Sequence, residues 1–353
     1  MVGHDAMACS SSKTRWKPCK AMRKKKRGFI MAEANQQPAG LPEEPVRVNH
    51  TVRNIIIAVV VVALVAVGAF FGVRAFNGSD RTAEKGTEAN PVKIGVVGAT
   101  DPQWVEFKKQ AEKQNLYVDI VDFQDYTSEN PAVDSGELDL NEFQHLLYLA
   151  NYNVQNNKDL QPIGGVAIYP LGVYSTKYKS IDEIPEGSTI PIPNDETNQA
   201  RAIGVLKAAG LVTMKGNWTP FSTPQDIDES KSKVKVTPLK AEQVANSLKD
   251  PQVAAGVINN DYVADAGLKA TDAIYQDDAE SEEARPYINI FATRKADVNN
   301  EVYKKVVEIF QTTSVLDKLQ ENSGGTAVLA DKFSTSELQD YLKTIEQEAK
   351  DAE

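Results

Sequence analysis

The segment 139–148 contains His145, the only histidine that follows the long apolar run near the N-terminus. On an extended chain Phe143 and His145 point the same way, and Tyr148 follows where the chain is expected to turn into a helix. An aromatic ring, an imidazole and a phenol at the C-terminal end of a strand are typical of one wall of a ligand pocket, because open α/β sheets bind ligands at that edge. The alternative is that Phe143 belongs to the core and His145 is a hydrogen-bonded surface histidine.

Arg201 is a second candidate, in the first two turns of a helix expected to begin near Asp195. A helix N-terminus offers free N–H groups and the positive end of the helix dipole, and arginine adds a planar, permanently charged fork. This combination is typical of a site that binds a carboxylate. The alternative is a surface arginine paired with Asp195 or Glu196, since such pairs are common and weak.

Three asparagines lie in or next to expected strands. Asn259 and Asn260 end an apolar strand, and Asn289 lies inside the strand-like segment 287–290. Asparagine is disfavoured in strands, so these positions suggest turns or contacts with a polar ligand. Tyr126 comes three residues after another expected strand and is equally placed to face a cleft.

The sequence gives little support for catalysis. A single histidine beyond the apolar run, with no cysteine to help it, cannot form a multi-histidine metal site. The chain has no G-x-S-x-G elbow before a helix and no H-E-x-x-H motif. The carboxylate pairs at 277–278 and 282–283 lie in polar sequence and are expected to be solvated. We therefore expect a protein that is not an enzyme and uses no metal or cofactor, with a hydrolase using Asp139 or His145 as the alternative.

The net charge of −10 is unevenly distributed. Residues 1–53 hold 11 Lys/Arg against 4 Asp/Glu, a net of +7, so the remaining residues hold 28 against 45, a net of −17. Binding to nucleic acid needs a basic footprint, so the acidic bulk argues against a nucleic-acid partner. The basic segment 1–53 is expected to be disordered and cytoplasmic.

The apolar run at 55–73 contains nineteen residues without a charge. A helix of this length spans roughly 28 Å, close to the thickness of a bilayer's hydrocarbon core. Because Lys/Arg crowd its N-terminal side, the positive-inside rule predicts a single transmembrane helix at 54–74 with the later residues outside the cell. Cleavage near 67–69 is the alternative, and no cysteine lies at or after the run to carry a lipid.

Folded structure is expected to begin at Val92, after a polar linker at 75–91. Strands and helices then alternate, which predicts parallel βαβ units and a twisted α/β sheet, with a second α/β unit inserted before the first is complete. The expected strands are 92–98, 116–123, the end of 139–145, a Pro170-interrupted segment after Gly165, 189–193, 234–237, 253–259 and 287–293. The last expected helix, 334–349, opens with a capping box formed by Ser334 and Glu337.

Six motifs, in this order, closely resemble the methionine-binding lipoproteins, the substrate-binding subunits of methionine ABC importers. They are F-Q-D-Y (123–126), L-D-L-N-E-F-Q-H-L-L-Y (138–148), Y-P-L-G-V-Y-S (169–175), I-P-N-D-E-T-N-Q-A-R (192–201), V-I-N-N-D-Y (257–262) and P-Y-I-N-I (286–290). The resemblance covers roughly residues 92–331, and F-Q-H together with P-N-D-x-T-N-x-x-R is specific.

The resemblance implies an α/β, two-lobed periplasmic-binding-protein fold of type II, here preceded by one transmembrane helix. Lobe 1 would comprise 92–180 and 286–345, and lobe 2 would comprise 181–285. Most members carry a lipid-attachment cysteine where this chain has an apolar run, so the mode of attachment differs. A second departure is Asn260, where relatives often have a small hydroxyl residue, which affects the expected side-chain selectivity.

The resemblance also implies a function and a set of ligand-binding residues. Arg201 would bind the carboxylate of L-methionine or a close analogue, Asn259 and Asn289 would bind its backbone groups, and Asn198 belongs to the same motif as Arg201. The thioether side chain would lie among Tyr126, Phe143, His145 and Tyr148. The loaded protein would deliver its ligand to an ABC permease and its ATPase. The alternative is a membrane-anchored sensor or interaction protein that uses the same fold.

Overall fold

The computed structural model describes residues 83–352. The expected cytoplasmic segment 1–53 and transmembrane helix 54–74 lie outside the described residues. Within 83–352, no helix combines the length and the apolar character needed to cross a bilayer.

A five-stranded sheet has the strand order β2-β1-β3-β11-β4. Its strands are β1 (Val92–Val97), β2 (Val118–Phe123), β3 (Leu140–His145), β4 (Leu160–Gly165) and β11 (Asn289–Arg294). Strands β2, β1 and β3 pair in parallel, as the strand–helix alternation predicts. Strand β11 runs antiparallel between β3 and β4, so a late segment of the chain completes a sheet that begins at Val92.

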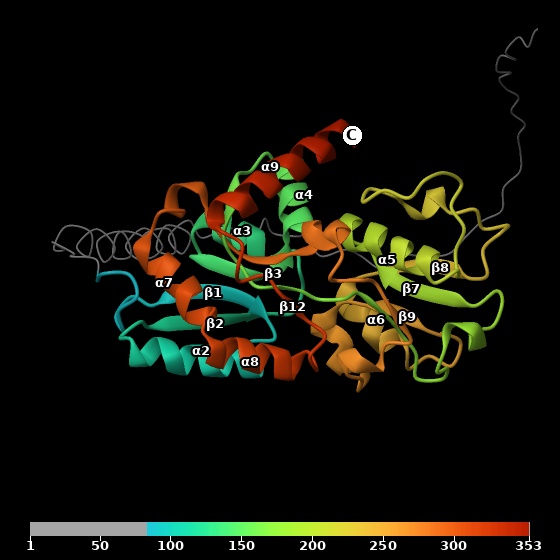
Figure 1. Ribbon diagram of the computed structural model, residues 1–353, viewed down its shortest axis with the longest axis horizontal. Helices are drawn as coiled ribbons and strands as arrows, with labels where there is room; N and C mark the ends of the chain where they lie inside the picture. The colour runs from blue at the N-terminus through green and yellow to red at the C-terminus, as the bar shows by residue number, and fades with distance from the viewer. Residues whose placement is uncertain (1–82, 353) are drawn as a thin grey trace, which may run out of the picture. The chain divides into compact units, whose positions relative to one another are not determined.

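Helices cover both faces of this sheet (Figure 1). On one face lie α2 (Pro102–Lys113), α7 (Glu301–Phe310) and α8 (Thr313–Asn322), and on the other lie α3 (Glu129–Ser135), α4 (Leu146–Asn156) and α9 (Thr335–Ala352). The helical face expected from Trp104, Phe107 and Ala111 is fully buried. Trp104 meets Phe291 edge-on, with ring centroids 6.1 Å apart, and this contact joins α2 to β11.

A second group of strands follows in the chain. Strands β6 (Gly172–Tyr174), β9 (Gly256–Ile258) and β10 (Tyr275–Gln276) form one sheet, and β7 (Thr189–Pro193) pairs in parallel with β8 (Lys235–Leu239). Helices α5 (Glu196–Ala208) and α6 (Ala241–Ser247) belong to this part of the chain. Ile190, Leu206 and Val257 share one buried cluster there, so this group has its own core.

The remaining elements are short. Strand β5 (Ala167–Ile168) pairs with β12 (Val328–Leu329), and Pro170 lies between β5 and β6, as expected of a residue without a backbone N–H. The 3₁₀ helices are η1 (Ile181–Glu183), η2 (Pro224–Asp226), η3 (Asn260–Ala266), η4 (Ala270–Asp272), η5 (Glu282–Tyr287) and η6 (Lys295–Asp297). The expected capping box is confirmed, because Ser334 Oγ accepts from Glu337 N–H while the Glu337 carboxylate accepts from Ser334 N–H.

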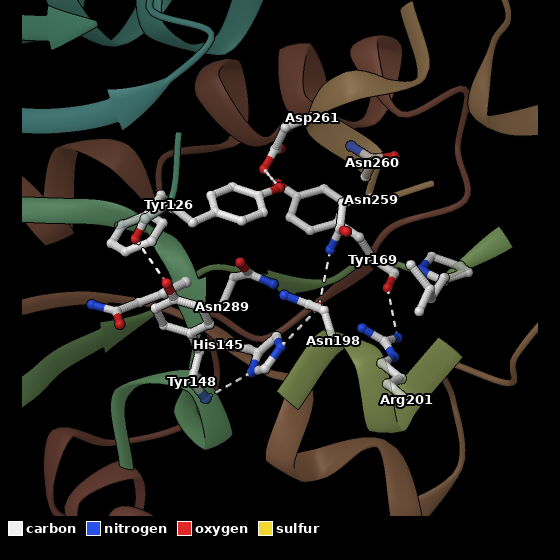
Figure 2. Close-up of a pocket in the computed structure, with 14 residues that line it drawn as sticks. Tyr126, His145, Tyr148, Tyr169, Asn198, Arg201, Asn259, Asn260, Asp261 and Asn289 are labelled. Carbon is white, nitrogen blue, oxygen red and sulfur yellow. Dashed lines mark hydrogen bonds between the residues drawn. The ribbon is translucent and has the colours of Figure 1, made fainter. Parts of the chain in front are cut away.

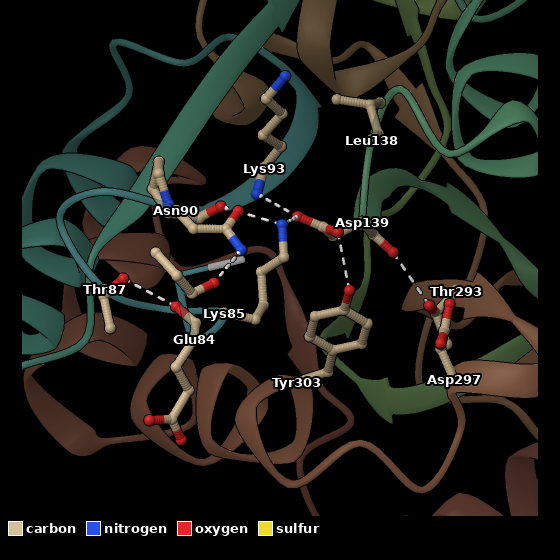
Figure 3. A network of polar contacts seen from close by, with 12 residues as sticks. Glu84, Lys85, Thr87, Asn90, Lys93, Leu138, Asp139, Thr293, Asp297 and Tyr303 are labelled. Atoms are coloured by element: carbon tan, nitrogen blue, oxygen red, sulfur yellow. Dashed lines mark hydrogen bonds and ion pairs between the residues drawn. The ribbon is translucent and has the colours of Figure 1, made fainter. Parts of the chain in front are cut away.

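Residues 83–91, expected to be the end of a linker, instead pack against the sheet through Asp139 (Figure 3). One carboxylate oxygen of Asp139 accepts from Lys85 Nζ at 3.0 Å and from Lys93 N–H at 2.8 Å. The other accepts from Tyr303 Oη at 2.7 Å. Local sequence could not predict this difference, because the partner of Lys85 lies 54 residues later.

Candidate functional site

A cavity of about 440 Å³, counting the part open to solvent, lies where β3, α5 and the segment after β9 meet (Figure 2). All eight residues expected to bind a ligand line it, namely Tyr126, Phe143, His145, Tyr148, Asn198, Arg201, Asn259 and Asn289. The other lining residues are Gln144, Tyr169, Pro170, Leu171, Asn260 and Asp261. The structure therefore brings together residues that the chain separates by up to 163 positions (126 to 289).

Three aromatic rings form one wall of the cavity. The ring centroids of Tyr126 and Phe143 are 5.8 Å apart, and those of Phe143 and Tyr148 are 5.6 Å apart with an interplanar angle of 77°. The Tyr148 hydroxyl donates to the Tyr126 carbonyl at 2.8 Å, which fixes the position of its ring. Such a wall can hold an apolar or sulfur-containing chain, since sulfur makes favourable contacts with ring edges.

His145 ends β3 and caps α4. Its Nδ1 accepts from Tyr148 N–H at 3.0 Å, so the ring proton is on Nε2, which lies 3.4 Å from Asn198 Oδ1 and donates to it. Burial, together with the nearby charge of Arg201, lowers the pKa of His145 to about 3. The imidazole is 6% exposed and neutral at physiological pH, so it presents an uncharged ring to the cavity.

The asparagines form a linked set. Asn198 Oδ1 accepts from Asn259 Nδ2 at 3.0 Å, and Asn198 Nδ2 donates to Asp195 Oδ1, also at 3.0 Å. Asp195 caps α5 by accepting from Asn198 N–H, and the predicted helix start near Asp195 is confirmed. Asn259 Oδ1 is buried and has no partner among residues 83–352. A buried acceptor without a donor is unfavourable, so this oxygen is ready to accept from a ligand.

Arg201 is 5% exposed and ion-paired with Asp277. Its Nε donates to Asp277 Oδ2 at 2.7 Å, and its Nη2 donates to Asp277 Oδ1 at 3.2 Å and to the Tyr169 carbonyl at 2.9 Å. Nη1 has no hydrogen-bond partner in the described part of the chain, so it can donate to a ligand. Two interpretations of the sequence are therefore wrong: Arg201 is not a surface arginine paired with Asp195 or Glu196, and Asp277 is not simply solvated.

Sequence reasoning missed Tyr287 and Asp261 as well as Asp277. The guanidinium of Arg201 lies 4.1 Å from the centroid of the Tyr287 ring, and that ring meets His145 edge-on with centroids 5.2 Å apart. Asp261 accepts from the Tyr126 hydroxyl at 2.7 Å. Asp261 lies in the motif V-I-N-N-D-Y and Tyr287 in the motif P-Y-I-N-I. Their positions in these motifs could have identified both as candidate site residues.

The arrangement can bind and orient a small molecule. It offers one guanidinium nitrogen, free amide oxygens and a wall of rings, which suits a small molecule with a carboxylate, N–H groups and an apolar chain. Within residues 83–352, no group of three His, Cys, Asp or Glu side chains is placed to hold a metal ion.

Comparison with known proteins agrees with this description. The D-methionine-binding lipoprotein MetQ of Escherichia coli K12 is 35% identical over 266 residues, which is 74% of this chain and 96% of the relative. A nutrient-binding protein from Burkholderia cenocepacia, solved bound to methionine, is 35% identical with a TM-score of 0.62, covering 68% of this chain and 99% of that one. Protein PG110 from Staphylococcus aureus is 33% identical with a TM-score of 0.67, covering 73% and 99%.

These relatives share the α/β fold described above. The NlpA lipoprotein family model matches residues 92–330, a segment that contains every residue lining the cavity. This chain therefore belongs to the NlpA lipoprotein family.

Proposed function

We propose that this chain is the solute-binding protein of an ABC importer and that it captures L-methionine or a close analogue. The observation that carries the proposal is the meeting, in one cavity, of a buried arginine with a free nitrogen, an unpaired amide oxygen and a wall of aromatic rings. A relative at 35% identity that was solved bound to methionine supports the choice of ligand.

The ligand's carboxylate binds to Nη1 of Arg201. The guanidinium is held by Asp277 and Tyr169, so little conformational entropy is lost when the carboxylate arrives. Asn259 supplies its free Oδ1 to an N–H of the ligand, and Asn289 binds a second backbone group. Asn198 positions Asn259 through their 3.0 Å hydrogen bond.

The thioether chain lies against Tyr126, Phe143, His145 and Tyr148. Each contact between sulfur and a ring contributes about 0.3–1.5 kcal/mol. A neutral His145 matters here, because a charged imidazole would favour water or an anion over an apolar chain. The protein returns its ligand unchanged, in contrast to an enzyme.

The cavity lies between two lobes, expected as residues 92–180 with 286–345 and residues 181–285, although β6 (Gly172–Tyr174) pairs with β9 and β10 and so belongs with the second lobe. Contacts across this division support the assignment: the Tyr126 hydroxyl donates to Asp261, and His145 donates to Asn198. Opening and closing of the lobes about the ligand reports loading to the permease and its ATPase, since closure is a common response of such clefts. Residues 54–74 cross the membrane with the N-terminus in the cytoplasm, which leaves the lobes outside the cell.

Calorimetric titration of the full-length protein with L-methionine, D-methionine and the other standard amino acids tests this proposal. We expect heat of binding from methionine, and recovery of the ligand unchanged by chromatography. Arg201→Ala should abolish binding, because a desolvated carboxylate then lacks its charged partner, a loss of several kcal/mol. Arg285→Ala is the matched control, since Arg285 is exposed and lies outside the cavity. Heat from none of the amino acids would remove the proposal.

A further inference from the structure

A short segment outside the ligand cavity contacts both proposed lobes. This strap, residues 218–223, lies between α5 and β8, and none of its residues lines the cavity. Trp218 attaches it to α5, the helix that carries Arg201, because Trp218 Nε1 donates to the Ala200 carbonyl at 2.8 Å. The Trp218 ring lies against Gly204, where an added Cβ would come within 2.8 Å of the ring. The strap is therefore fixed to the second lobe.

The strap is a turn with several internal hydrogen bonds. The Thr219 N–H donates to Ser222 Oγ at 2.9 Å, and the Ser222 N–H donates to the Thr219 carbonyl at 3.0 Å. The Phe221 N–H donates to Thr219 Oγ1 at 3.3 Å. Pro220 restricts the backbone between them, since its ring fixes φ. These restraints hold the Phe221 side chain in one position relative to α5.

Phe221 packs against the core of the first lobe. It is partly buried against the apolar cluster that contains Leu149 of α4 together with Leu342 and Ile345 of α9. Within the described part of the chain, Phe221 is the one residue of 181–278 that belongs to this cluster. One side chain of the second lobe thus extends the apolar core of the first.

A groove of about 820 Å³, counting the part open to solvent, runs beside this contact. Its walls are α4, the end of α9, the start of α5 and the strap. Gln155 of α4 also donates to the carboxylate of Glu196 on α5. Because the contact is only partly buried and borders an open groove, the two sides can separate without exposing a closed core. These are the properties of a contact that forms and breaks.

We propose that the strap holds the closed form of the protein together, and that Phe221 must leave the first lobe before the ligand can leave the cavity. This inference rests on the proposed function and adds a conformational device to it. The hydrogen bonds from Tyr126 to Asp261 and from His145 to Asn198 join the lobes beside the ligand. The strap joins them outside the cavity, so it affects how long a ligand stays and not which ligand binds. Any contact made only in the closed form shifts the equilibrium toward that form.

The test measures the rate at which tritiated L-methionine leaves the full-length protein when excess unlabelled methionine is added. Phe221→Ala should raise the release rate roughly 3- to 10-fold, as expected when about half of the burial of a phenylalanine is lost. The association rate should change little, because changes at an interface act mostly on dissociation. Phe221→Leu keeps most of the apolar surface and should release methionine within about 2-fold of the wild-type rate.

Phe333→Ala is the matched control. Phe333 is also partly buried against the same apolar cluster, but it precedes α9 and meets Tyr341 of that helix, with ring centroids 6.1 Å apart. Its contacts therefore lie within the first lobe. The change should lower the Tm of the protein while leaving the release rate of methionine as in wild type.

The outcomes separate the inference from the function on which it rests. If wild-type protein binds no methionine, the proposed function fails and the inference fails with it. If wild-type protein binds methionine and Phe221→Ala releases it at the wild-type rate, methionine capture stands and the role of the strap is overturned. An equal acceleration by Phe333→Ala would overturn it as well, because loosening of the first lobe would then explain both results.

Discussion

The guanidinium of Arg201 and the carboxylate of Asp277 form a two-point ion pair, with 2.7 Å between Nε and Oδ2 and 3.2 Å between Nη2 and Oδ1. The two residues are 76 positions apart, on α5 and just after β10. The pair orients the arginine toward the cavity and balances its charge when no ligand is present. A ligand carboxylate therefore meets a fixed Nη1 rather than a mobile fork.

Asp277→Asn should lower stability yet increase the response to ligand. The change leaves the charge of Arg201 without a counter-ion, which costs about 1–3 kcal/mol after allowance for the 26% exposure of the Asp277 side chain. The ligand's carboxylate then becomes the only counter-ion, so methionine should raise the Tm of the variant more than that of wild type. Thermal unfolding with and without methionine measures both effects. Asp278→Asn, at the exposed neighbouring position, is the control. An unchanged Tm, or a smaller ligand-induced shift, would contradict the role of the pair.

His145 should make stability fall as the pH is lowered. Its pKa is depressed from 6.5 to about 3, so between these values the unfolded chain binds a proton that the folded chain does not. The free energy of unfolding then decreases by up to ~1.4 kcal/mol per pH unit below about pH 6.5. His145→Asn keeps a good helix cap and removes this titration. Urea unfolding of both proteins at about pH 7 and about pH 5 should show a steeper loss for wild type. Parallel pH profiles would refute the assignment of a neutral, buried imidazole.

Glu129 offers a stabilising substitution. It is 0% exposed, and neither carboxyl oxygen has a partner within residues 83–352. Burial and the charge of Glu142 raise its pKa well above the usual value, so the folded chain keeps a proton that the unfolded chain loses above about pH 4.5. Glu129→Met should therefore stabilise the protein by about 1–3 kcal/mol near pH 7, and the gain should shrink as the pH falls toward 4.5. Glu137→Met at an exposed position is the control. A gain that does not vary with pH would point to packing alone.

The hydrogen bond from Tyr303 to Asp139 should contribute more to the free energy of unfolding than the ion pair between Lys85 and Asp139. The Tyr303 hydroxyl is buried and donates to Asp139 at 2.7 Å, whereas the Lys85 side chain is 28% exposed. Tyr303→Phe should cost about 1.5–3 kcal/mol, as expected for a buried hydrogen bond to a charged group, and Lys85→Gln about 1 kcal/mol or less. Denaturant unfolding measures both, and the reverse order would show that the charge pair dominates.

The local parts of the fold could be predicted from the sequence. The helix cap at Asp195, the capping box at Ser334 and the interruption at Pro170 all depend on residues within a few positions of one another. Strand–helix alternation likewise predicted the parallel arrangement of β2, β1 and β3. Each of these features is set by backbone chemistry or by the period of apolar residues.

Long-range polar pairing could not be predicted in this way. Asp277 lies in a run of polar residues and looks solvated, and only the folded chain brings it to Arg201. Lys85 looked like part of a linker for the same reason. The eight candidate residues do meet in one cavity, although it was the family resemblance that grouped them, and the ligand contact of each stays a prediction. His145 was predicted in part. The sequence predicted its place at the end of a strand and before a helix, but not the hydrogen bond by which it caps that helix.

The most direct test of methionine capture is to locate the ligand. Crystals of protein made with ordinary methionine, grown with L-selenomethionine as ligand, give an anomalous selenium signal that only the ligand supplies. We predict one strong peak roughly 5 Å from the rings of Tyr126, Phe143 and Tyr148, with the ligand's carboxylate on Nη1 of Arg201. No peak in this cavity, or a ligand carboxylate away from Arg201, would contradict the account.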